Sequence, residues 1–322
     1  MSLTTTRIGY KPFKYDWAYA SWKTQQSIHW LPDEVPLADD VKDWSGKLTK
    51  EEKNLLTQIF RFFTQADIEV NDCYMNRYAQ IFKPTEIKMM LAAFSNMETI
   101  HIDAYSHLLE TVGMPEVEYS SFMKYKAMKD KCDYLQAVTN DNPMDIAVAL
   151  ATFGAFTEGL SLFASFAMLL NFPRHNKMKG MGQIITWSVR DETLHCESII
   201  KLFNTYVSEN KLDREELGIR IVAVAEAIVA QEDAFIDLAF ELGAVEGMTA
   251  DDIKKYIRYI ADRRLLQLKF RTHFKVKKNP LLWMEEMLNG KEHGNFFETR
   301  VTEYSKSATT GTWEEAFDVL HD

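Results

Sequence analysis

Two identical patterns, each a glutamate followed three positions later by a histidine, are the residues in this sequence most suited to chemistry. One runs from Glu98 to His101 and the other from Glu192 to His195, so they begin 94 positions apart. Residues three apart on an α-helix project from the same face, and each pattern therefore presents one carboxylate and one imidazole to a common point. Proteins bind transition metals through these two groups. The paired patterns predict a metal site between two helices.

A dinuclear site of this type takes one further acid from each of two other helices. Glu158 supplies one, because it lies in the middle of an apolar stretch where an unpaired charge would be costly. The other comes from the stretch before residue 82, where Asp67 and Glu69 are the candidates. Asp67 lies closer to the apolar stripe of that helix, which favours it, and Glu69 remains the alternative. Four acids and two imidazoles suit iron or manganese better than zinc.

Capping residues and helix breakers divide the chain into long helical segments. We expect helices over residues 49–82, 85–112, 119–137, 144–172, 177–207, 214–242 and 250–274. With only 13 Gly and 8 Pro in 322 residues, the composition suits long helices better than strands and turns. The expected fold is all-α, a ferritin-like helical bundle with a di-metal carboxylate site.

We expect three parts along the chain: an extended N-terminal segment over 1–48, the bundle over 49–300, and a flexible C-terminal tail over 301–322. In the tail, Trp313, Phe317 and Leu320 have the spacing of an amphipathic anchor that folds onto a partner. A frayed terminus is the alternative.

Composition excludes several classes of function and location. The formal net charge of −10 argues against nucleic-acid binding. The N-terminal sequence does not resemble a secretory signal, and the three cysteines show no paired spacing, so we expect a cytoplasmic protein with reduced thiols. The stretch 144–172 is long and apolar enough to cross a membrane. Glu158 at its centre instead favours a buried core helix, and we expect no membrane association.

Two residues beside the patterns could take part in the chemistry. Tyr105 lies one turn after His101 on the same helical face, where its phenol could give an electron and a proton to an oxidised metal. It could equally be an ordinary core tyrosine. Asp191 precedes Glu192 and could orient an imidazole by hydrogen bonding, or be a surface charge beside Arg190. Spacing alone leaves both questions open.

Four segments carry a resemblance to a known family. They are Trp30–Val35, Glu98–Tyr105, Arg190–His195 and Asn295–Tyr304. In order and spacing they resemble the small, or beta, subunit of class I ribonucleotide reductases. The resemblance implies a ferritin-like homodimer that stores a tyrosyl radical for a large catalytic (alpha) subunit, bound through the C-terminal tail. That holoenzyme reduces ribonucleotides to deoxyribonucleotides.

The resemblance also implies a cofactor and its ligands. The cofactor would be a dinuclear metal centre, with two iron ions as the first expectation and two manganese ions or a mixed pair as alternatives. One metal would be held by Asp67, Glu98 and His101, and the other by Glu158, Glu192 and His195. The sequence leaves open whether oxygen alone or an accessory flavoprotein supplies the oxidant.

The remaining roles concern the radical. Tyr105 matches the radical tyrosine, and Trp30, linked through Asp191 to the first histidine, matches the start of the path between subunits. Tyr304 matches the tail tyrosine that relays the radical onward. Phe166 matches part of the apolar wall around the radical, whereas Ser188 lies where many members carry an aliphatic residue. Another di-metal oxidase of the same fold, such as a desaturase or hydroxylase, is the alternative function, and a metal-storage bundle is a third.

Overall fold

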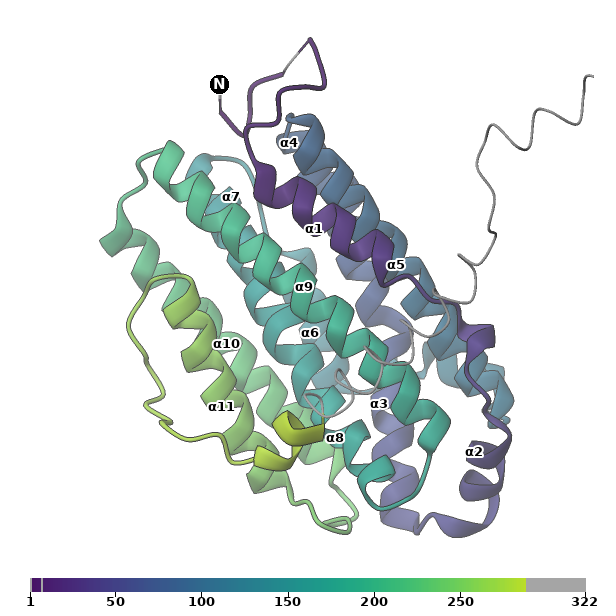
Figure 1. Ribbon diagram of the computed structural model, residues 1–322. Coiled ribbons are helices and arrows are strands. Elements are labelled where there is room, and N and C mark those ends of the chain that lie inside the picture. Colours follow the sequence, from purple (N-terminus) through teal and green to yellow (C-terminus); the bar gives the residue numbers. More distant parts are fainter. Residues whose placement is uncertain (1, 7, 288–322) are drawn as a thin grey trace, which may run out of the picture. The chain divides into compact units, whose positions relative to one another are not determined.

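The computed structural model describes residues 2–6 and 8–287 (Figure 1). Residues 1–280 form one compact unit. The regular secondary structure of its described residues is helical, apart from one isolated β-bridge between Val245 and Met248. The all-α prediction is confirmed.

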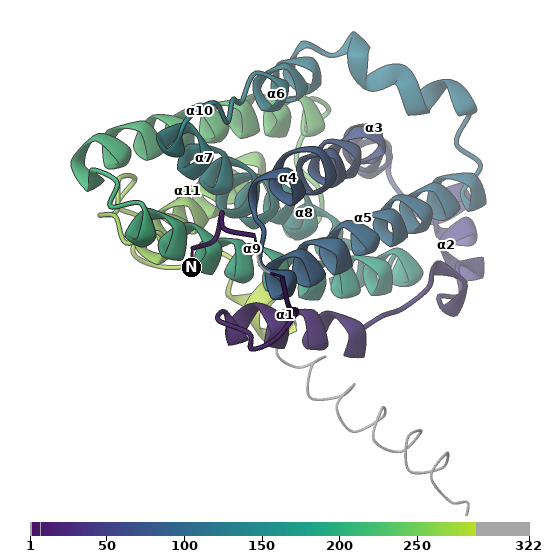
Figure 2. The same cartoon turned by 90° about the horizontal axis from the view of Figure 1, so that it is seen from above.

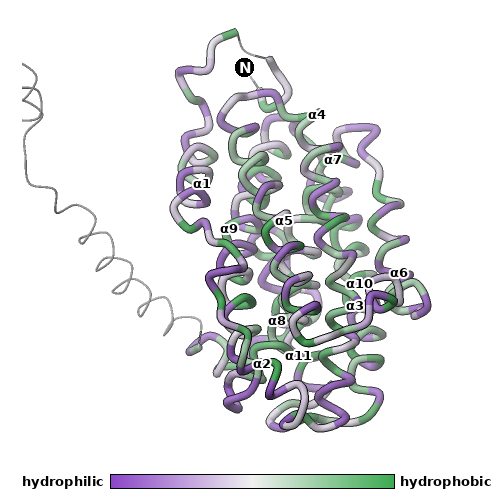
Figure 3. The backbone as a smooth tube through the Cα atoms, turned by 90° about the vertical axis from the view of Figure 1, so that its right-hand side faces the viewer, coloured by the Kyte–Doolittle hydropathy of each residue, from purple (hydrophilic) through white to green (hydrophobic). Residues whose placement is uncertain are grey.

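Long helices make up most of the bundle. They are α3 (Lys50–Asp72), α5 (Thr85–Thr111), α9 (Lys179–Glu209), α10 (Arg214–Ala239) and α11 (Ala250–Gln267). A further long rod consists of α7 (Pro143–Leu150), the π-helical segment η5 (Ala151–Ser161) and α8 (Leu162–Arg174) in direct succession. Figure 3 shows hydrophobic and hydrophilic residues alternating along the long helices of the bundle, as expected for helices with one buried face.

Shorter elements complete the unit. They are α1 (Asp16–Ser27), η1 (Pro32–Glu34), α2 (Ala38–Lys42), η2 (Asp43–Lys47), η3 (Cys73–Tyr78), α4 (Ala79–Ile81), η4 (Glu116–Lys124) and α6 (Lys126–Gln136). The predicted helix over 119–137 is therefore divided, because η4 is a 3₁₀ segment and only α6 is α-helical. The last predicted helix is shorter than expected and ends at Gln267.

Four elements surround the centre of the bundle. α5 packs against α3 and α9, and η5 packs against α9. α10 and α11 lie together over the outer side of η5, while α1 lies along α5 and α9 (Figures 1 and 2). Both glutamate–histidine patterns and the two further acids are thus on helices that meet in the core.

The expectation that residues 1–48 form an extended segment is wrong for α1. This helix has no Gly or Pro in its interior, and it buries Ala18, Ser21 and Gln25 from one face. The preceding residues are also held in place, since the backbone amides of Lys14 and Tyr15 donate to Glu86 Oε1 on α5 at 2.8 and 3.0 Å. The N-terminal segment is therefore part of the bundle's packing.

The apolar rod from Pro143 to Arg174 is a core helix. Asn142 caps its start by accepting hydrogen bonds from the amides of Met144 and Asp145. The rod is long and apolar enough for a membrane span, but 89% of its most apolar window is buried inside the protein. Its apolar composition is explained by the bundle core, as the sequence predicts. The π-helical turns of η5 were not predicted, and they surround Glu158.

Close packing of η5 on α9 gives a test of the fold. A Cβ added at Gly154 would lie 2.3 Å from Ile199 Cγ2 and 2.6 Å from Ile199 Cβ, which no rotamer change relieves. We predict that Gly154→Ala lowers the free energy of unfolding of the metal-free protein by about 1–3 kcal/mol, the usual cost of overpacking. Urea denaturation measures this.

The control is Gly46→Ala, where an added Cβ has no atom within 4 Å. That variant should stay within about 0.5 kcal/mol of the starting protein. Equal stability of the two variants would show that η5 and α9 do not pack as closely at Gly154 and Ile199 as the structure has them.

Candidate metal centre

Six side chains from α3, α5, η5 and α9 converge in the core. They form two groups in which the potential ligand atoms lie within 4.8 Å of one another: Glu98, Glu158, Glu192 and His195, and Asp67, Glu98 and His101. None of the six is more than 1% exposed. The structure thus brings together all the residues that the sequence nominated as metal ligands.

Two of the acids lie between the two imidazoles. Glu98 places Oε1 3.1 Å from His195 Nδ1 and Oε2 3.6 Å from His101 Nδ1. Glu192 places Oε1 3.2 Å from His101 Nδ1 and Oε2 3.6 Å from His195 Nδ1. Each of these carboxylates therefore faces both halves of the cluster, which is the arrangement expected of bridging ligands.

Asp67 and Glu69, the two candidates on α3, have different surroundings. Asp67 is 1% exposed and belongs to the cluster, whereas Glu69 accepts hydrogen bonds from Gln65 and Gln136, both at 2.8 Å. Two residues apart on α3, the acids point in different directions. The geometry supports the preference for Asp67.

The donor set fits a pair of cations. Inside the cluster, buried oxygens of all four acids and the Nδ1 atoms of both histidines have no hydrogen-bond partner. Buried polar atoms are rarely left unpaired, because each lost partner costs free energy. Hard oxygen ligands with two imidazoles suit iron or manganese. Bound cations would satisfy these atoms together.

The pKa shifts of the cluster acids also indicate that the cluster lacks positive charge. Burial raises the pKa of Asp67 and of Glu158 well above the usual range, and neighbouring carboxylates add to both shifts. Burial also acts to raise the pKa of Glu98, but its close contacts with His101 and His195 outweigh burial and lower that pKa to about 2. The two imidazoles therefore stabilise the charged form of Glu98, whereas burial disfavours the charged forms of Asp67 and Glu158.

A hydrogen-bond network behind the cluster fixes both imidazoles. His101 Nε2 donates to Asp191 Oδ2 at 3.3 Å, and His195 Nε2 donates to Gln25 Oε1 at 3.0 Å. Gln25 Nε2 in turn donates to Asp191 Oδ1 at 3.3 Å, so the two histidines share one support. Their Nδ1 atoms are left facing the acids, as metal ligation requires. The predicted orienting role of Asp191 agrees with this geometry.

Two supporting residues were missed by sequence reasoning. Gln25 lies on α1, within the segment expected to be extended, and a buried polar side chain there has no motif to reveal it. Tyr74 lies on η3, and its hydroxyl donates to Glu158 Oε1 at 2.6 Å, leaving Oε2 for the cluster. Its position seven residues after Asp67, on the same helical face, was the only available signal.

Tyr105 lies beside the cluster in an apolar setting. It is 5% exposed, and its ring centroid lies 4.7 Å from that of Phe63 and 6.3 Å from that of His101. The ring of Phe63 also packs edge-on against Phe166, at a centroid distance of 6.0 Å. Burial, followed by the charge of Asp67, raises the pKa of the phenol well above its usual value. Tyr105 is therefore a protonated phenol shielded from water.

Ser188 proves to be the hydrogen-bond partner of that phenol. Tyr105 Oη donates to Ser188 Oγ at 3.0 Å. An aliphatic residue at this position could not accept that bond, so Ser188 gives the phenol a defined orientation.

Trp30 is buried beside the same network. It is 2% exposed, and its Nε1 donates to Asp191 Oδ2 at 2.8 Å, the oxygen that also accepts from His101. The predicted chain from Trp30 through Asp191 to His101 is continuous in the structure. Tyr304 and the rest of the predicted tail lie outside the described residues.

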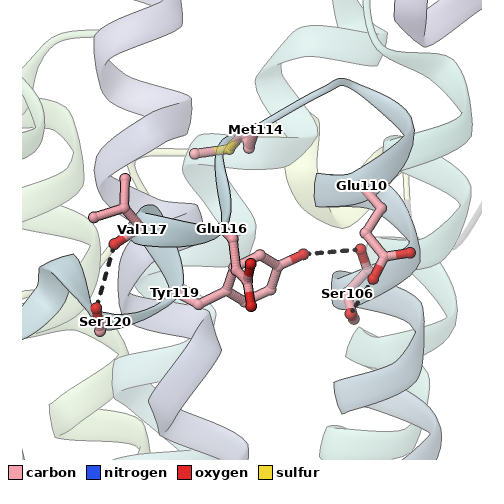
Figure 4. Close-up of a pocket in the computed structure, with 7 residues that line it drawn as sticks. All are labelled: Ser106, Glu110, Met114, Glu116, Val117, Tyr119 and Ser120. Atoms are coloured by element: carbon pink, nitrogen blue, oxygen red, sulfur yellow. Dashed lines mark hydrogen bonds between the residues drawn. The ribbon is translucent and has the colours of Figure 1, made fainter.

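A separate surface pocket of about 830 Å³ lies where α5 ends and η4 begins (Figure 4). Tyr119 points across it, and its hydroxyl donates to the carbonyl oxygen of Ser106 at 3.5 Å. None of the six cluster residues lines this pocket.

Comparison with known proteins decides the family. The family model for the ribonucleotide reductase small chain matches residues 7–280. This chain belongs to that family. Its relatives include the probable small subunit of ribonucleoside-diphosphate reductase from Invertebrate iridescent virus 3, which is 45% identical over 97% of this chain and 88% of the relative. The beta subunit from Chlamydia pneumoniae is 30% identical over 91% of this chain and 88% of its own length.

Solved structures show the same fold for this small chain. A putative class I ribonucleotide reductase from Bacillus halodurans aligns with a TM-score of 0.78 at 23% identity, covering 84% of this chain and 99% of that one. A dimanganese(II) NrdF protein from Streptococcus sanguinis aligns with a TM-score of 0.73 at 19% identity, covering 86% and 96%. The ferritin-like prediction is confirmed.

Replacement of a cluster acid should reduce metal binding by this small chain. Glu158→Ala should sharply lower the number of metal ions bound per chain, because it removes one of four buried acids. The variant should still fold, since alanine favours helix and the change removes a buried carboxyl group. Elemental analysis of the loaded protein and circular dichroism measure the two effects.

Asp67→Ala and Glu69→Ala form the matched control pair. The first should lose metal, and the second should bind as much as the unmodified protein. Full metal occupancy in either Glu158→Ala or Asp67→Ala would remove that residue from the ligand set.

Proposed function

We propose that this chain is the radical-generating small subunit of ribonucleoside-diphosphate reductase and that Tyr105 carries the radical. Membership of the small-chain family supports the role of the subunit. The observation that carries the residue assignment is a buried phenol beside a cluster of four acids and two imidazoles.

Residues of the cluster would hold two metal ions. We assign Asp67, Glu98 and His101 to one ion, and Glu158, Glu192 and His195 to the other, with Glu98 and Glu192 placed to bridge. When bound, the metals supply the oxidising power that amino-acid side chains lack. Two iron ions are our first choice, and two manganese ions or a mixed pair share the same ligand preferences.

Tyr105 would give one electron and its hydroxyl proton to the oxidised centre. A tyrosyl radical persists only where water and reductants cannot touch the phenoxyl group directly, and the burial of Tyr105 against Phe63, which itself packs on Phe166, supports this. Ser188 holds the hydroxyl in place before oxidation. Its own hydroxyl, which both accepts and donates, is free to rotate and donate to the phenoxyl oxygen afterwards.

The radical would leave the core along His101, Asp191 and Trp30. Two hydrogen bonds to one carboxylate oxygen connect these groups. We propose that Tyr304 then relays the radical to a large catalytic subunit docked on the C-terminal tail. A desaturase or hydroxylase would have no use for this path. We further propose that the chain is a cytoplasmic homodimer.

Replacement of the radical tyrosine tests the function. Tyr105→Phe should bind metals normally, because no ligand changes, but it should show no tyrosyl signal by electron paramagnetic resonance after metal loading and oxidation. It should also support no ribonucleotide reduction with the large subunit. Tyr78→Phe is the control, since Tyr78 is equally buried but bonds the carbonyl of Ala149. A Tyr105→Phe variant that keeps the signal and the activity would contradict the assignment.

Removal of the tail tests the partnership. Deletion of residues 305–322 should leave metal content and the Tyr105 radical unchanged, because all cluster residues lie elsewhere. The same deletion should abolish binding to the large subunit, and a synthetic peptide of these residues should compete with the intact chain. Calorimetry of the two subunits measures both, and unchanged affinity of the truncated chain would refute docking through the tail.

A further inference from the structure

Trp30 is enclosed by the protein, so an electron from solution can reach it only through a neighbouring side chain. Only 2% of its surface is exposed, and its indole N–H is already bonded to Asp191. Within the described part of the chain, its ring has two aromatic neighbours. His101 lies on the metal side at a centroid distance of 6.1 Å, and Trp187 lies at 5.1 Å.

Trp187 reaches solvent from this enclosed position. Its side chain is half-buried, so Trp187 contacts Trp30 and is also partly open to water. It lies on α9 one turn before Asp191, on the same helical face. The next residue, Ser188, accepts a hydrogen bond from the phenol of Tyr105. Two adjacent residues of α9 therefore contact the buried tyrosine and the enclosed tryptophan.

Arg190 on α9 fixes the loop that carries Trp30 to that helix. Arg190 donates to the carbonyl oxygen of Ile28 at 2.6 Å and lies 3.5 Å from Asp191 Oδ1. The loop that carries Trp30 is thereby tied to the helix that carries Trp187. Because both rings sit on anchored segments, their separation is set by the fold rather than by side-chain motion.

We propose that Trp187 is the surface end of the electron path, where a one-electron donor in solution delivers electrons to Trp30. This inference rests on the proposed function. In the step itself, the Trp187 indole loses one electron to an oxidised Trp30, which returns to its reduced form. The donor then reduces Trp187 by one electron, and no bond forms or breaks at either ring. The oxidant is the Tyr105 radical, which regains one electron along this path and would take back from the metal centre the hydroxyl proton that it gave up on oxidation.

Indole is suited to this place because it is among the most easily oxidised side chains and need not lose a proton to be oxidised. The 5.1 Å centroid distance puts the two rings in direct contact, so the electron crosses no intervening group. Trp187 and Trp30 together thus join the buried network to the surface without opening the bundle to water. The tail serves a different task, since it would bring the large subunit.

Reduction of the Tyr105 radical by an external donor tests the proposal. The loaded and oxidised full chain, without the large subunit, is mixed with a reduced viologen, a one-electron donor too bulky to enter the bundle. Loss of the tyrosyl signal is followed by electron paramagnetic resonance. Trp187→Phe keeps an aromatic ring but not an easily oxidised one, and the signal should decay several-fold more slowly than in the unmodified chain.

Two comparison variants separate electron transfer from packing. Trp187→Tyr restores an oxidisable ring and should decay faster than Trp187→Phe, whereas a purely structural role would affect both alike. Trp44→Phe changes another half-buried tryptophan that contacts Phe60, and it should decay like the unmodified chain. Metal content and the starting radical yield are measured for every variant.

The outcomes distinguish this inference from the function on which it rests. Slow decay in Trp30→Phe with unchanged decay in Trp187→Phe would overturn the role of Trp187 alone. Unchanged decay in Trp30→Phe would overturn the path through Trp30 and Trp187 with it. A chain that forms no tyrosyl radical would overturn the proposed function and this inference together.

Discussion

The structure depends on burying four carboxylates beside two imidazoles in the interior of a helical bundle. Transfer of even one unpaired carboxylate from water to a protein interior costs several kcal/mol, and neighbouring like charges add to that cost. The metal-free chain reduces this cost by pairing Glu98 with the two histidines, while burial disfavours the charged forms of Asp67 and Glu158. Two bound cations would offset the charge of the four carboxylates more completely. The arrangement of the six side chains around one buried space follows from this requirement.

The outer parts of the bundle hold the cluster in a fixed geometry. α1 brings Gln25 and the following loop brings Trp30, and both engage Asp191. π-Helical segments carry Tyr74 and Glu158, whose hydrogen bond fixes one carboxylate oxygen. A side chain that is held by neighbours loses less freedom when it binds metal, so a rigid surround favours one defined centre over many weak ones.

The sequence was sufficient to predict which six side chains gather in the core, and Asp191 behind them, but not Gln25 or Tyr74. Two glutamate–histidine patterns, one acid in an apolar helix and one beside an apolar stripe follow simple rules of helical spacing, and the structure brings all of them together. Gln25, Tyr74 and Trp187 act across the bundle, and their positions depend on which helices become neighbours. No local pattern reports that. The π-helical turns are likewise a tertiary effect, because the segment reads as an ordinary apolar helix.

The most direct test is a crystal structure of the metal-loaded protein with anomalous diffraction recorded at the absorption edges of iron and manganese. The account predicts two anomalous peaks enclosed by the six cluster residues and roughly 3.5–4 Å apart, as in other two-metal sites. One peak should lie beside Asp67 and His101, and the other beside Glu158 and His195. A single peak, or metals bound away from these side chains, would contradict it.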